Sequence, residues 1–453
     1  MITIQCSSEL LAEKKYIFEI IFTEFLGIEY SILHNDECND ISIELKNGKL
    51  IIFNSLFLNG SDESYLNFSN LPSVVITENI FTPENNIPVL FGQGNIIDVS
   101  KEQIKCGIDI FSTCFFMLSR MEEAIIQDRD SNDRFAAKSS VAYQYGILDR
   151  PIVDEYVEML WNMMKHLDGN IERKAYKPSN FITCDVDWPF DVTKNSFYLT
   201  CRKSMGDLIH RKSLKQCFNT LKNYTLEVLN FNDKDYLTEN LRWMMDVNEE
   251  AGNKVSFYFI TEYTSKNDIK VNFDSDKMRK LFNEINNRGH EIGLHPGYNC
   301  FDSDQNFKKS AETLRRVLKE ENLSQRIIGG RMHFLRWDIL KTPQLWDKYN
   351  FNYDTTLSYA DAAGFRCGTC HEFSMFDLKS RKKMSLKQRP LITMESTIIG
   401  PKYENLGYTE NALNRFKYFK NICHKYNGEY VLLWHNSSFE NEKNKEFYKE
   451  IIQ

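Results

Sequence analysis

The strongest constraint on the fold is a series of short apolar segments, from about Lys177 onward, that alternate with longer helical segments. Six of them are typical of buried strands: FITCDVD, KVSFYFIT, HEIGLH, RIIGGRMHF, LITME and YVLLWH. Strands that alternate with helices predict an α/β architecture with parallel strands. Polar and ionisable residues follow the strands at their C-terminal ends, where α/β sheets and barrels place their functional sites. We therefore expect a functional site at that edge.

The first 165 or so residues predict a smaller, mixed α+β unit. The sequence favours helices over Leu10–Phe25, Ile104–Ile126 and Val153–His166, where apolar residues recur at helical spacing. The dipeptide Asn47-Gly48 lies between two strand-like runs and suits a tight hairpin turn. No cluster of catalytic residue types occurs here. We therefore expect a packing or substrate-docking module rather than an enzymatic one.

The length of 453 residues exceeds that of one ordinary compact domain and predicts two. We place an accessory domain at residues 1–170 and an α/β domain at residues 171–453. The region near 195–254 is mostly helical and charged. It is expected to be an insertion between the first two strands of the α/β domain.

Charge and hydropathy exclude several classes of partner. The formal net charge is −7, and no long basic run with interleaved aromatic residues occurs, so nucleic acid is not an expected partner. The first twenty residues lack the pattern of a signal peptide, and no apolar run has the length of a transmembrane segment. These features predict a cytoplasmic protein without a membrane span.

Two carboxylates at positions i and i+2, Asp185 and Asp187, end the first apolar strand. Side chains at this spacing leave the same side of an extended backbone and can converge on one ion. One can then bind a divalent metal while the other accepts a proton from water beside it. The simpler interpretation is that the two residues mark a strand end and cap the next helix.

Two histidines and an arginine follow other strands. His295 ends HEIGLH next to a proline and a glycine, and a neutral imidazole at a strand end is a good metal ligand. Arg331 could hold a carboxylate ionised, and Arg336 could do the same for an anionic group of a substrate. His435 ends YVLLWH and could protonate a leaving amine. Each histidine could instead be a buried, hydrogen-bonded residue.

The eleven cysteines are scattered, and we interpret them as reduced thiols. One cluster, Cys367-Gly-Thr-Cys370-His371, has the spacing of covalent haem attachment. Such attachment needs an exported chain, for which the sequence gives no sign. A zinc knuckle is equally disfavoured because no second closely spaced pair of ligands follows.

In this succession the motifs resemble those of the polysaccharide deacetylase family, carbohydrate esterase family four. The resemblance of CDVD implies that Asp185 is the general base and Asp187 a metal ligand. GHEIGLH implies His295 as a ligand, RMHF implies that Arg331 orients the base, and LLWH implies His435 as the general acid. The family's usual fold is a distorted (β/α) barrel, which we expect for residues 171–453.

The N-terminal segments FFMLSRMEEA, DRFAAKSS and LDRPIVDEY also resemble the leading domain of a bacterial subgroup of this family. That subgroup is often associated with surface-polysaccharide assembly. GFRCGTC and YDTTLSYAD belong to the same pattern, which further disfavours haem at the two cysteines. The resemblance thus covers nearly the whole chain.

One departure from the family concerns the metal. The second motif normally offers another histidine four residues after the first, and Asn299 stands there. Asn299 could coordinate through its oxygen, or His333, which replaces the proline usual in the arginine motif, could supply the missing ligand. If neither does, the chain could be a binding module on a deacetylase scaffold.

The resemblance implies a hydrolase that removes an acyl group, expected to be N-acetyl, from an amino sugar in surface-polysaccharide or glycolipid biosynthesis. The expected cofactor is a divalent metal, with zinc the best match to an imidazole-rich set. The expected substrate is an N-acylated sugar, nucleotide-linked or lipid-linked. The alternative is a catalytically inactive carbohydrate-binding protein. Trp188, Tyr298 and Trp434 could line a sugar subsite or simply pack in the core.

Overall fold

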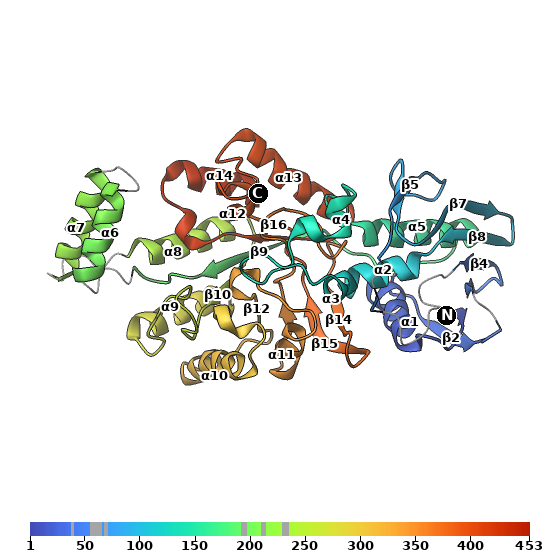
Figure 1. Ribbon diagram of the computed structural model, residues 1–453, viewed down its shortest axis with the longest axis horizontal. Coiled ribbons are helices and arrows are strands. Elements are labelled where there is room, and N and C mark those ends of the chain that lie inside the picture. The colour runs from blue at the N-terminus through green and yellow to red at the C-terminus, as the bar shows by residue number, and fades with distance from the viewer. Residues whose placement is uncertain (38–39, 55–65, 68–70, 192–196, 210–213, 229–234) are drawn as a thin grey trace.

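The computed structural model describes residues 1–37, 40–54, 66–67, 71–191, 197–209, 214–228 and 235–453 (Figure 1). The α-helices are α1 (Leu11–Phe18), α2 (Ile110–Leu118), α3 (Met121–Ile125), α4 (Val141–Gln144), α5 (Ile152–Leu167), α6 (Phe197–Ile209), α7 (Leu214–Val228), α8 (Tyr236–Glu250), α9 (Asp276–Asn287), α10 (Asp304–Glu320), α11 (Thr342–Lys348), α12 (Glu395–Ile398), α13 (Glu410–Lys425) and α14 (Glu442–Ile452). The 3₁₀ and π turns are η1 (Glu19–Phe25), η3 (Ala137–Ser139), η5 (Tyr298–Cys300), η6 (His333–Leu335) and η7 (Asn436–Ser438).

The strands form two large sheets and one small one. The strands are β1 (Ile2–Cys6), β2 (Tyr30–His34), β3 (Ile41–Glu44), β4 (Leu50–Phe53), β5 (Val75–Thr77), β6 (Ile87–Val89), β7 (Gly92–Val99), β8 (Gln103–Ile108), β9 (Ser179–Val186), β10 (Val255–Phe259), β11 (Glu291–Leu294), β12 (Gly329–Gly330), β13 (Tyr353–Asp354), β14 (Phe373–Asp377), β15 (Lys382–Gln388), β16 (Thr393–Met394) and β17 (Glu429–Leu433).

The larger sheet has nine strands in the order β14-β15-β13-β12-β11-β10-β9-β17-β16. All neighbours pair in parallel except β14, which runs antiparallel to β15 at one edge. In the view of Figure 1, helices α9, α10 and α11 lie below the strands, and α13 and α14 lie above them. The predicted α/β architecture with parallel strands is thus confirmed.

The expected closed barrel is not found among the described residues. The sheet is open in its pairing, because β14 and β16 are end strands and do not pair with each other. At its end of the sheet, β16 pairs with β17 through two residue pairs. The hairpin β14–β15 ends the opposite edge and was not predicted from the sequence.

Glycines allow the short strands of this sheet to approach closely. A Cβ at Gly330 would lie 1.9 Å from the carbonyl oxygen of Leu294, and a Cβ at Gly293 would lie 2.5 Å from that of Gly329. Strands β11 and β12 can therefore lie side by side only without side chains at these positions. Both strands deliver residues to the site described below.

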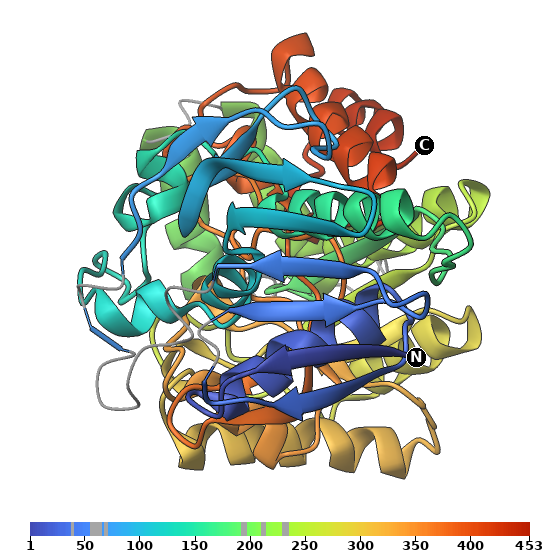
Figure 2. The ribbon, with the colours of Figure 1, turned by 90° about the vertical axis from the view of Figure 1, so that its right-hand side faces the viewer.

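Residues 1–170, here called the leading segment, carry the second large sheet, with the order β2-β1-β3-β4-β8-β7 (Figure 2). Asn47-Gly48 joins β3 and β4 in the predicted hairpin, and Gly48 has a φ of 80°. The predicted helix over Ile104–Ile126 is wrong at its start. Residues 103–108 form strand β8 of this sheet, and the helix begins only at Ile110. The predicted boundary at residue 170 stays a prediction.

The leading segment and the larger sheet share buried charged contacts. Glu123 Oε1 accepts a hydrogen bond from Arg120 Nε at 2.8 Å, and Glu123 Oε2 accepts one from Arg366 Nη2 at 2.6 Å. Arg120 also donates to the carbonyl of Arg366. All three side chains are buried. Removing one of these side chains would leave a buried charge without its partner, which is strongly destabilising. These contacts therefore help to fix the position of the leading segment against the rest of the chain.

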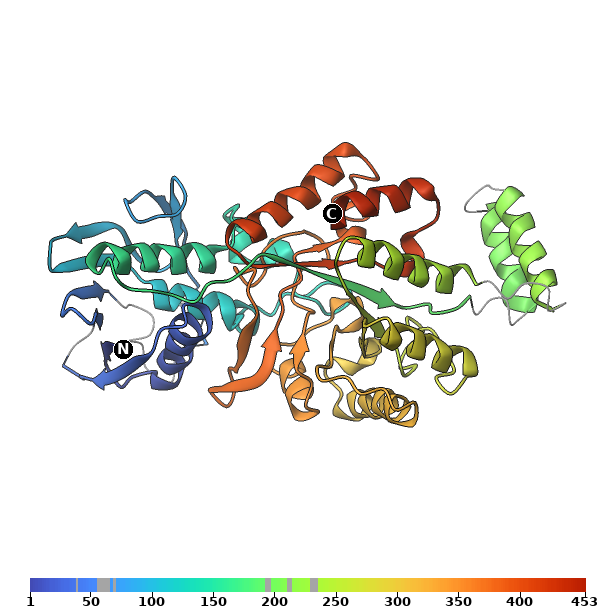
Figure 3. The ribbon, with the colours of Figure 1, turned by 180° about the vertical axis from the view of Figure 1, so that it is seen from behind.

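The predicted helical insertion contains α6, α7 and α8. Figure 3 shows α6 and α7 as a hairpin that stands apart from the body, whereas α8 packs on it. Within the described part of the chain, no helix has both the length and the apolar character needed to cross a bilayer.

Candidate metal centre

The predicted site residues meet at the C-terminal edge of the larger sheet. Asp185 belongs to β9, and Asp187 follows the end of that strand. His295, Arg331 and His435 come directly after, or two residues after, the ends of β11, β12 and β17. Because these strands pair in parallel, their carboxyl ends lie side by side. The structure therefore brings these five side chains to one place.

Three side chains form a group that can hold a metal ion: Asp187, His295 and His333. Nε2 of His295 lies 3.4 Å from Oδ1 of Asp187, and Nε2 of His333 lies 3.6 Å from the same oxygen. Oδ1 of Asp187 is buried and has no hydrogen-bond partner among the described residues. Such an atom is costly unless something binds it, and a cation between it and the two imidazoles would do so.

Both imidazoles are oriented through their other ring nitrogen. Nδ1 of His295 lies 2.6 Å from the carbonyl oxygen of Arg331, and Nδ1 of His333 lies 2.8 Å from Oδ1 of Asp268. Carbonyl and carboxylate oxygens only accept hydrogen bonds, so Nδ1 donates in both rings. In the neutral imidazoles the lone pair is then on Nε2, which faces Asp187. Metal-binding histidines are held in this way.

The electrostatics of the group favour a cation. Burial alone would raise the pKa of Asp187, but His333, His295 and His435 hold that pKa well below its usual range. Burial alone would lower the pKa of His295, but Asp185 and Asp187 raise it. The Asp187 carboxylate is thus ionised and attracts positive charge to this point.

Asp185 is held by an arginine rather than by the metal group alone. Arg331 is fully buried and donates from Nη1 to Oδ1 of Asp185 at 2.7 Å. Its other donors bind Thr183 Oγ1 at 2.9 Å and both oxygens of Thr355. Oδ2 of Asp185 lies 3.7 Å from Nε2 of His295. The guanidinium therefore fixes one carboxylate oxygen and leaves the other on the side of the metal group.

His435 has its own carboxylate partner, Glu395, at the start of α12. Nδ1 of His435 lies 2.6 Å from Oε1 of Glu395, which also accepts a hydrogen bond from Ser438 Oγ at 2.9 Å. Burial alone would lower the pKa of His435, but Glu395 raises it to about 10. The imidazole is therefore protonated at neutral pH and can act as a proton donor.

A cavity of about 260 Å³ connects these groups. It is lined by Arg134, Asp185, Asp187, His295, His333, Phe334, Leu335, Ala360, Met394, Ser396, Tyr403, Leu433 and His435. The lining thus combines ionisable groups with apolar side chains. The volume is just below the usual range of pockets that bind small molecules, which fits a small group rather than a long chain. Arg134 comes from the leading segment.

The turn that carries His333 has an unusual backbone. Phe334 and Leu335 have φ values of 62° and 55°, in the left-handed region that residues with a Cβ rarely adopt. Each such residue costs on the order of 1–2 kcal/mol, and such strain persists only where the surroundings hold it. Both residues line the cavity. Backbone strain of this kind is typical of functional sites.

Sequence reasoning missed Asp268 and Glu395, the partners of the two histidines. Glu395 follows the strand LITM and could have been found by the same rule as the others. Asp268 lies in the loop after β10, nine residues beyond its end, and no periodic pattern marks it. Burial alone would raise the pKa of Asp268, but hydrogen bonds from His333 and Thr264 lower it to about 2.

Two predicted residues lie outside the metal group. Asn299 is exposed, and its side-chain amide donates to the carbonyl of Thr264 at 2.9 Å. Arg336 is buried but binds Asp133 at 2.6 Å and the carbonyls of Asn132 and Tyr298. Neither side chain lines the cavity. Asn299 and Arg336 therefore have other partners in this structure, and their roles as a ligand and as a substrate-binding residue stay predictions.

The predicted sugar-stacking residues do not line the cavity either. Trp434 is fully buried and packs on Phe439 and Tyr448, so it is a core residue. Successive residues of a strand point to opposite faces, so Trp434 turns away from the side that His435 faces. Tyr298 is half-buried, lies under the Arg336 guanidinium, and is absent from the lining. Trp188 is half-buried and absent from it as well.

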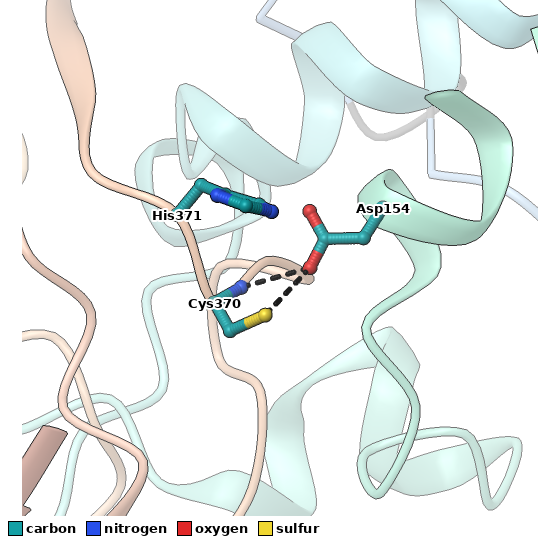
Figure 4. A group of neighbouring side chains, drawn as sticks. All are labelled: Asp154, Cys370 and His371. Carbon is teal, nitrogen blue, oxygen red and sulfur yellow. Dashed lines mark hydrogen bonds between the residues drawn. The ribbon is translucent and has the colours of Figure 1, made fainter. Parts of the chain in front are cut away.

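A second group of potential ligands, Asp154, Cys370 and His371, lies where α5 meets the chain before β14 (Figure 4). Here the carboxylate is already satisfied. Thr369 Oγ1 donates to Asp154 at 2.5 Å, and Cys370 donates from its backbone nitrogen at 2.9 Å and from Sγ at 3.1 Å. Its oxygens have partners, in contrast to Asp187. We therefore interpret this group as a structural joint.

The buried joint also bears on the haem alternative. Cys367 and Cys370 are both buried, and the Cys370 thiol is used in the joint. Burial raises the pKa of both thiols. Thiols that are buried and protonated are poor nucleophiles, and these two are inaccessible to a haem group.

Comparisons with known proteins gave weak matches. The model of a family of unknown function, DUF7033, matches residues 2–169. No curated protein matches the chain. Among solved structures, a candidate polysaccharide deacetylase from Mycobacterium smegmatis is similar at 14% identity, with a TM-score of 0.40, over 62% of this chain and 84% of that one.

Two further solved structures are similar over 48% of this chain, each at 13% identity. One is a candidate polysaccharide deacetylase from Pseudomonas aeruginosa PAO1, with a TM-score of 0.34 over 68% of its length. The other is the Puue allantoinase, with a TM-score of 0.32 over 67% of its length. Identities and scores this low transfer no activity to this chain.

Proposed function

We propose that this chain is a metal-dependent hydrolase that removes an acyl group, expected to be acetyl, from the nitrogen of an amino sugar. The observation that carries this proposal is the convergence of two imidazole Nε2 atoms on a buried carboxylate oxygen without a partner, at Asp187. One carboxylate and two imidazoles are a set that suits zinc and leaves a coordination position open.

Asp187, His295 and His333 would hold the ion, with His333 in place of the histidine that the family motif offers at position 299. When bound, a divalent ion polarises a carbonyl oxygen and lowers the pKa of nearby water. The side chains of the chain do the rest of the chemistry.

Asp185 is the proposed general base. Its Oδ1 is fixed by Arg331 at 2.7 Å, and its Oδ2 faces His295, on the side where the metal would be held. Because Arg331 fixes the position of the carboxylate, Asp185 can take the proton from the attacking water. Arg331 acts through Asp185 and is a positioning residue.

His435 is the proposed general acid. With a pKa raised to about 10 by Glu395, its imidazole is protonated at neutral pH and can protonate the departing amine. It lines the same cavity as Asp185, so both proton transfers can occur on one bound substrate. The small, partly apolar cavity suits an acetyl group and one sugar residue, carried on a nucleotide or lipid.

The test begins with elemental analysis of the purified full chain, wild type beside His295→Ala and His333→Ala. We expect near-stoichiometric zinc in the wild type and loss of it in both variants. Acetate release is then measured from a panel of N-acetylated amino sugars: free, nucleotide-linked, lipid-linked and as short oligosaccharides.

Each variant separates a different part of the proposal. Asp185→Asn should keep zinc but lose acetate release, because it removes the base and not a ligand. A wild type that stays free of metal after zinc is added would contradict the hydrolase and favour the carbohydrate-binding alternative. Zinc binding without acetate release from any member of the panel would support the proposed metal centre. It would contradict the proposal that the substrate is an N-acetylated amino sugar.

A further inference from the structure

A short turn of the leading segment, Asp130–Arg134, reaches the candidate metal centre although it lies far from it in the sequence. The turn is closed by its own hydrogen bonds: the backbone nitrogen of Asp130 donates to the carbonyl of Arg134 at 2.9 Å. Oδ1 of Asp130 accepts from the backbone nitrogens of Asn132 and Arg134 at 2.7 and 3.0 Å. Its shape is thus set locally.

Four hydrogen bonds join this turn to the two segments that carry His295 and His333. Arg134 Nη1 donates to the carbonyl of Phe334 at 3.1 Å. Arg336 donates to Asn132 O at 2.9 Å and to Asp133 Oδ2 at 2.6 Å. Tyr298 donates through its hydroxyl to Asn132 Oδ1 at 3.1 Å.

The contact with Phe334 is the most informative of these. Phe334 and Leu335 have left-handed backbones, and His333 comes directly before them. Arg134 binds the carbonyl of the strained residue itself, so it holds the conformation that points His333 toward Asp187. Arg134 is in turn fixed by Asp130 at 2.7 Å and by the Tyr403 hydroxyl at 3.2 Å.

Arg134 also belongs to the cavity. It is buried and lines the same space as the three candidate ligands and His435. Its guanidinium carries several donors in a fixed plane, which suits recognition of oxygen atoms. A substrate in the cavity therefore meets a side chain of the leading segment.

We propose that the Asp130–Arg134 turn is part of the hydrolytic site: it holds the His333–Leu335 turn in place, and Arg134 forms one wall of the substrate cavity. This inference rests on the proposed function and deepens it. The leading segment, for which sequence reasoning gave only a packing or docking role, becomes a component of the site. Arg134 is a positioning residue for His333.

The test compares Arg134→Ala, Arg134→Lys and Arg129→Ala in the full chain. Arg129 is the matched control, because it is an arginine of the same stretch that donates only to carbonyls of Glu123, Ile126 and Asp128, all in the leading segment. Zinc affinity is measured by competition with a chromophoric chelator, which needs no substrate. Thermal unfolding without zinc reports folding.

We expect Arg134→Ala to bind zinc about tenfold more weakly, because the strained turn beside His333 loses a charge-assisted hydrogen bond that holds it. Arg134→Lys should lose less, because its ammonium keeps the pair with Asp130 but cannot reach Phe334 and Tyr403 together. If Arg134→Ala does not fold, the zinc affinity of Arg134→Lys tests the role of the turn instead. Arg129→Ala should bind zinc as the wild type does.

The opposite results have separate meanings. Wild-type zinc affinity in both Arg134 variants would overturn the role of the turn while leaving the proposed function intact. Equal losses in the Arg129 and Arg134 variants would also overturn it, because they would reflect general damage to the leading segment. A wild type that binds no zinc would overturn the proposed function itself.

Discussion

Replacing Asp268 with asparagine tests whether His333 is a metal ligand without touching the metal group. Oδ1 of Asp268 accepts hydrogen bonds from His333 Nδ1 and from the backbone nitrogen of Tyr298, each at 2.8 Å. Oδ2 accepts three: from the backbone nitrogens of Thr264 and Ser265 at 2.8 and 2.9 Å, and from Thr264 Oγ1 at 2.6 Å. All five groups donate, so both oxygens must accept.

Asparagine can satisfy only one side of this arrangement. Its oxygen should take the place of Oδ2, where three donors meet, and its NH₂ group then faces His333 and Tyr298. His333 must turn away or shift its proton to Nε2, the atom that faces Asp187. Either response removes a ligand lone pair from the site. Loss of such partners weakens metal binding by roughly 10- to 100-fold, or about 1.4 to 2.7 kcal/mol.

The assay is zinc competition with a chromophoric chelator, on the full chain at neutral pH. Asp274→Asn is the matched control, because Asp274 is an exposed aspartate whose partners are Arg279 and Arg316, away from the cavity. We expect the control to keep wild-type affinity. An Asp268→Asn variant with unchanged zinc affinity and a normal fold would refute the role of His333 as a ligand. The third ligand would then have to be another residue, such as Asn299.

Three further predictions concern neighbouring groups. Arg331→Met should destabilise the fold by about 3–5 kcal/mol in urea unfolding, because the Asp185 side chain stays buried without its partner. A change below about 1 kcal/mol would contradict the idea that the fold depends on this buried pair. Glu395→Gln should lower the pKa of His435 from about 10. The alkaline limb of the pH profile of kcat should therefore move to lower pH, and an unmoved limb would exclude His435 as the general acid. Cys370 should resist alkylation in the folded chain, because burial raises its pKa, and rapid labelling would revive a redox role for it.

The strand ends were the part of the site that sequence could predict. Asp185 and Asp187 follow one apolar strand, and His295, Arg331 and His435 follow three others, so parallel pairing alone brings them together. The same rule covers Glu395, which directly follows strand β16. The α/β architecture was predictable for the same reason, since strands and helices alternate.

Residues outside the strands depend on how loops fold, and local patterns do not encode that. Asn299 was a candidate ligand because it stands where the family's second motif offers another histidine. In the structure, its side-chain amide donates to the carbonyl of Thr264. Trp434 is different: strand alternation already implied that it faces away from the side of His435.

The two groups of potential ligands show why residue types alone do not define a metal centre. Each contains an aspartate, a histidine and a third donor within reach of one another. In the group at Asp154, neighbouring donors occupy both carboxylate oxygens, and a cation would have to displace them. In the group at Asp187, one oxygen has no partner among the described residues. Counting hydrogen bonds separates the two groups, and the sequence cannot supply that count.

The departure at Asn299 and the leading segment are connected through one turn. A ligand at position 333 lies beside Phe334 and Leu335, whose left-handed backbones cost free energy and need outside support. Arg134 supplies that support from the leading segment. On our proposals, a chain whose third ligand comes from this turn depends on a partner segment to hold it. That dependence would explain why the Asp130–Arg134 turn of the leading segment contacts the turn that carries His333.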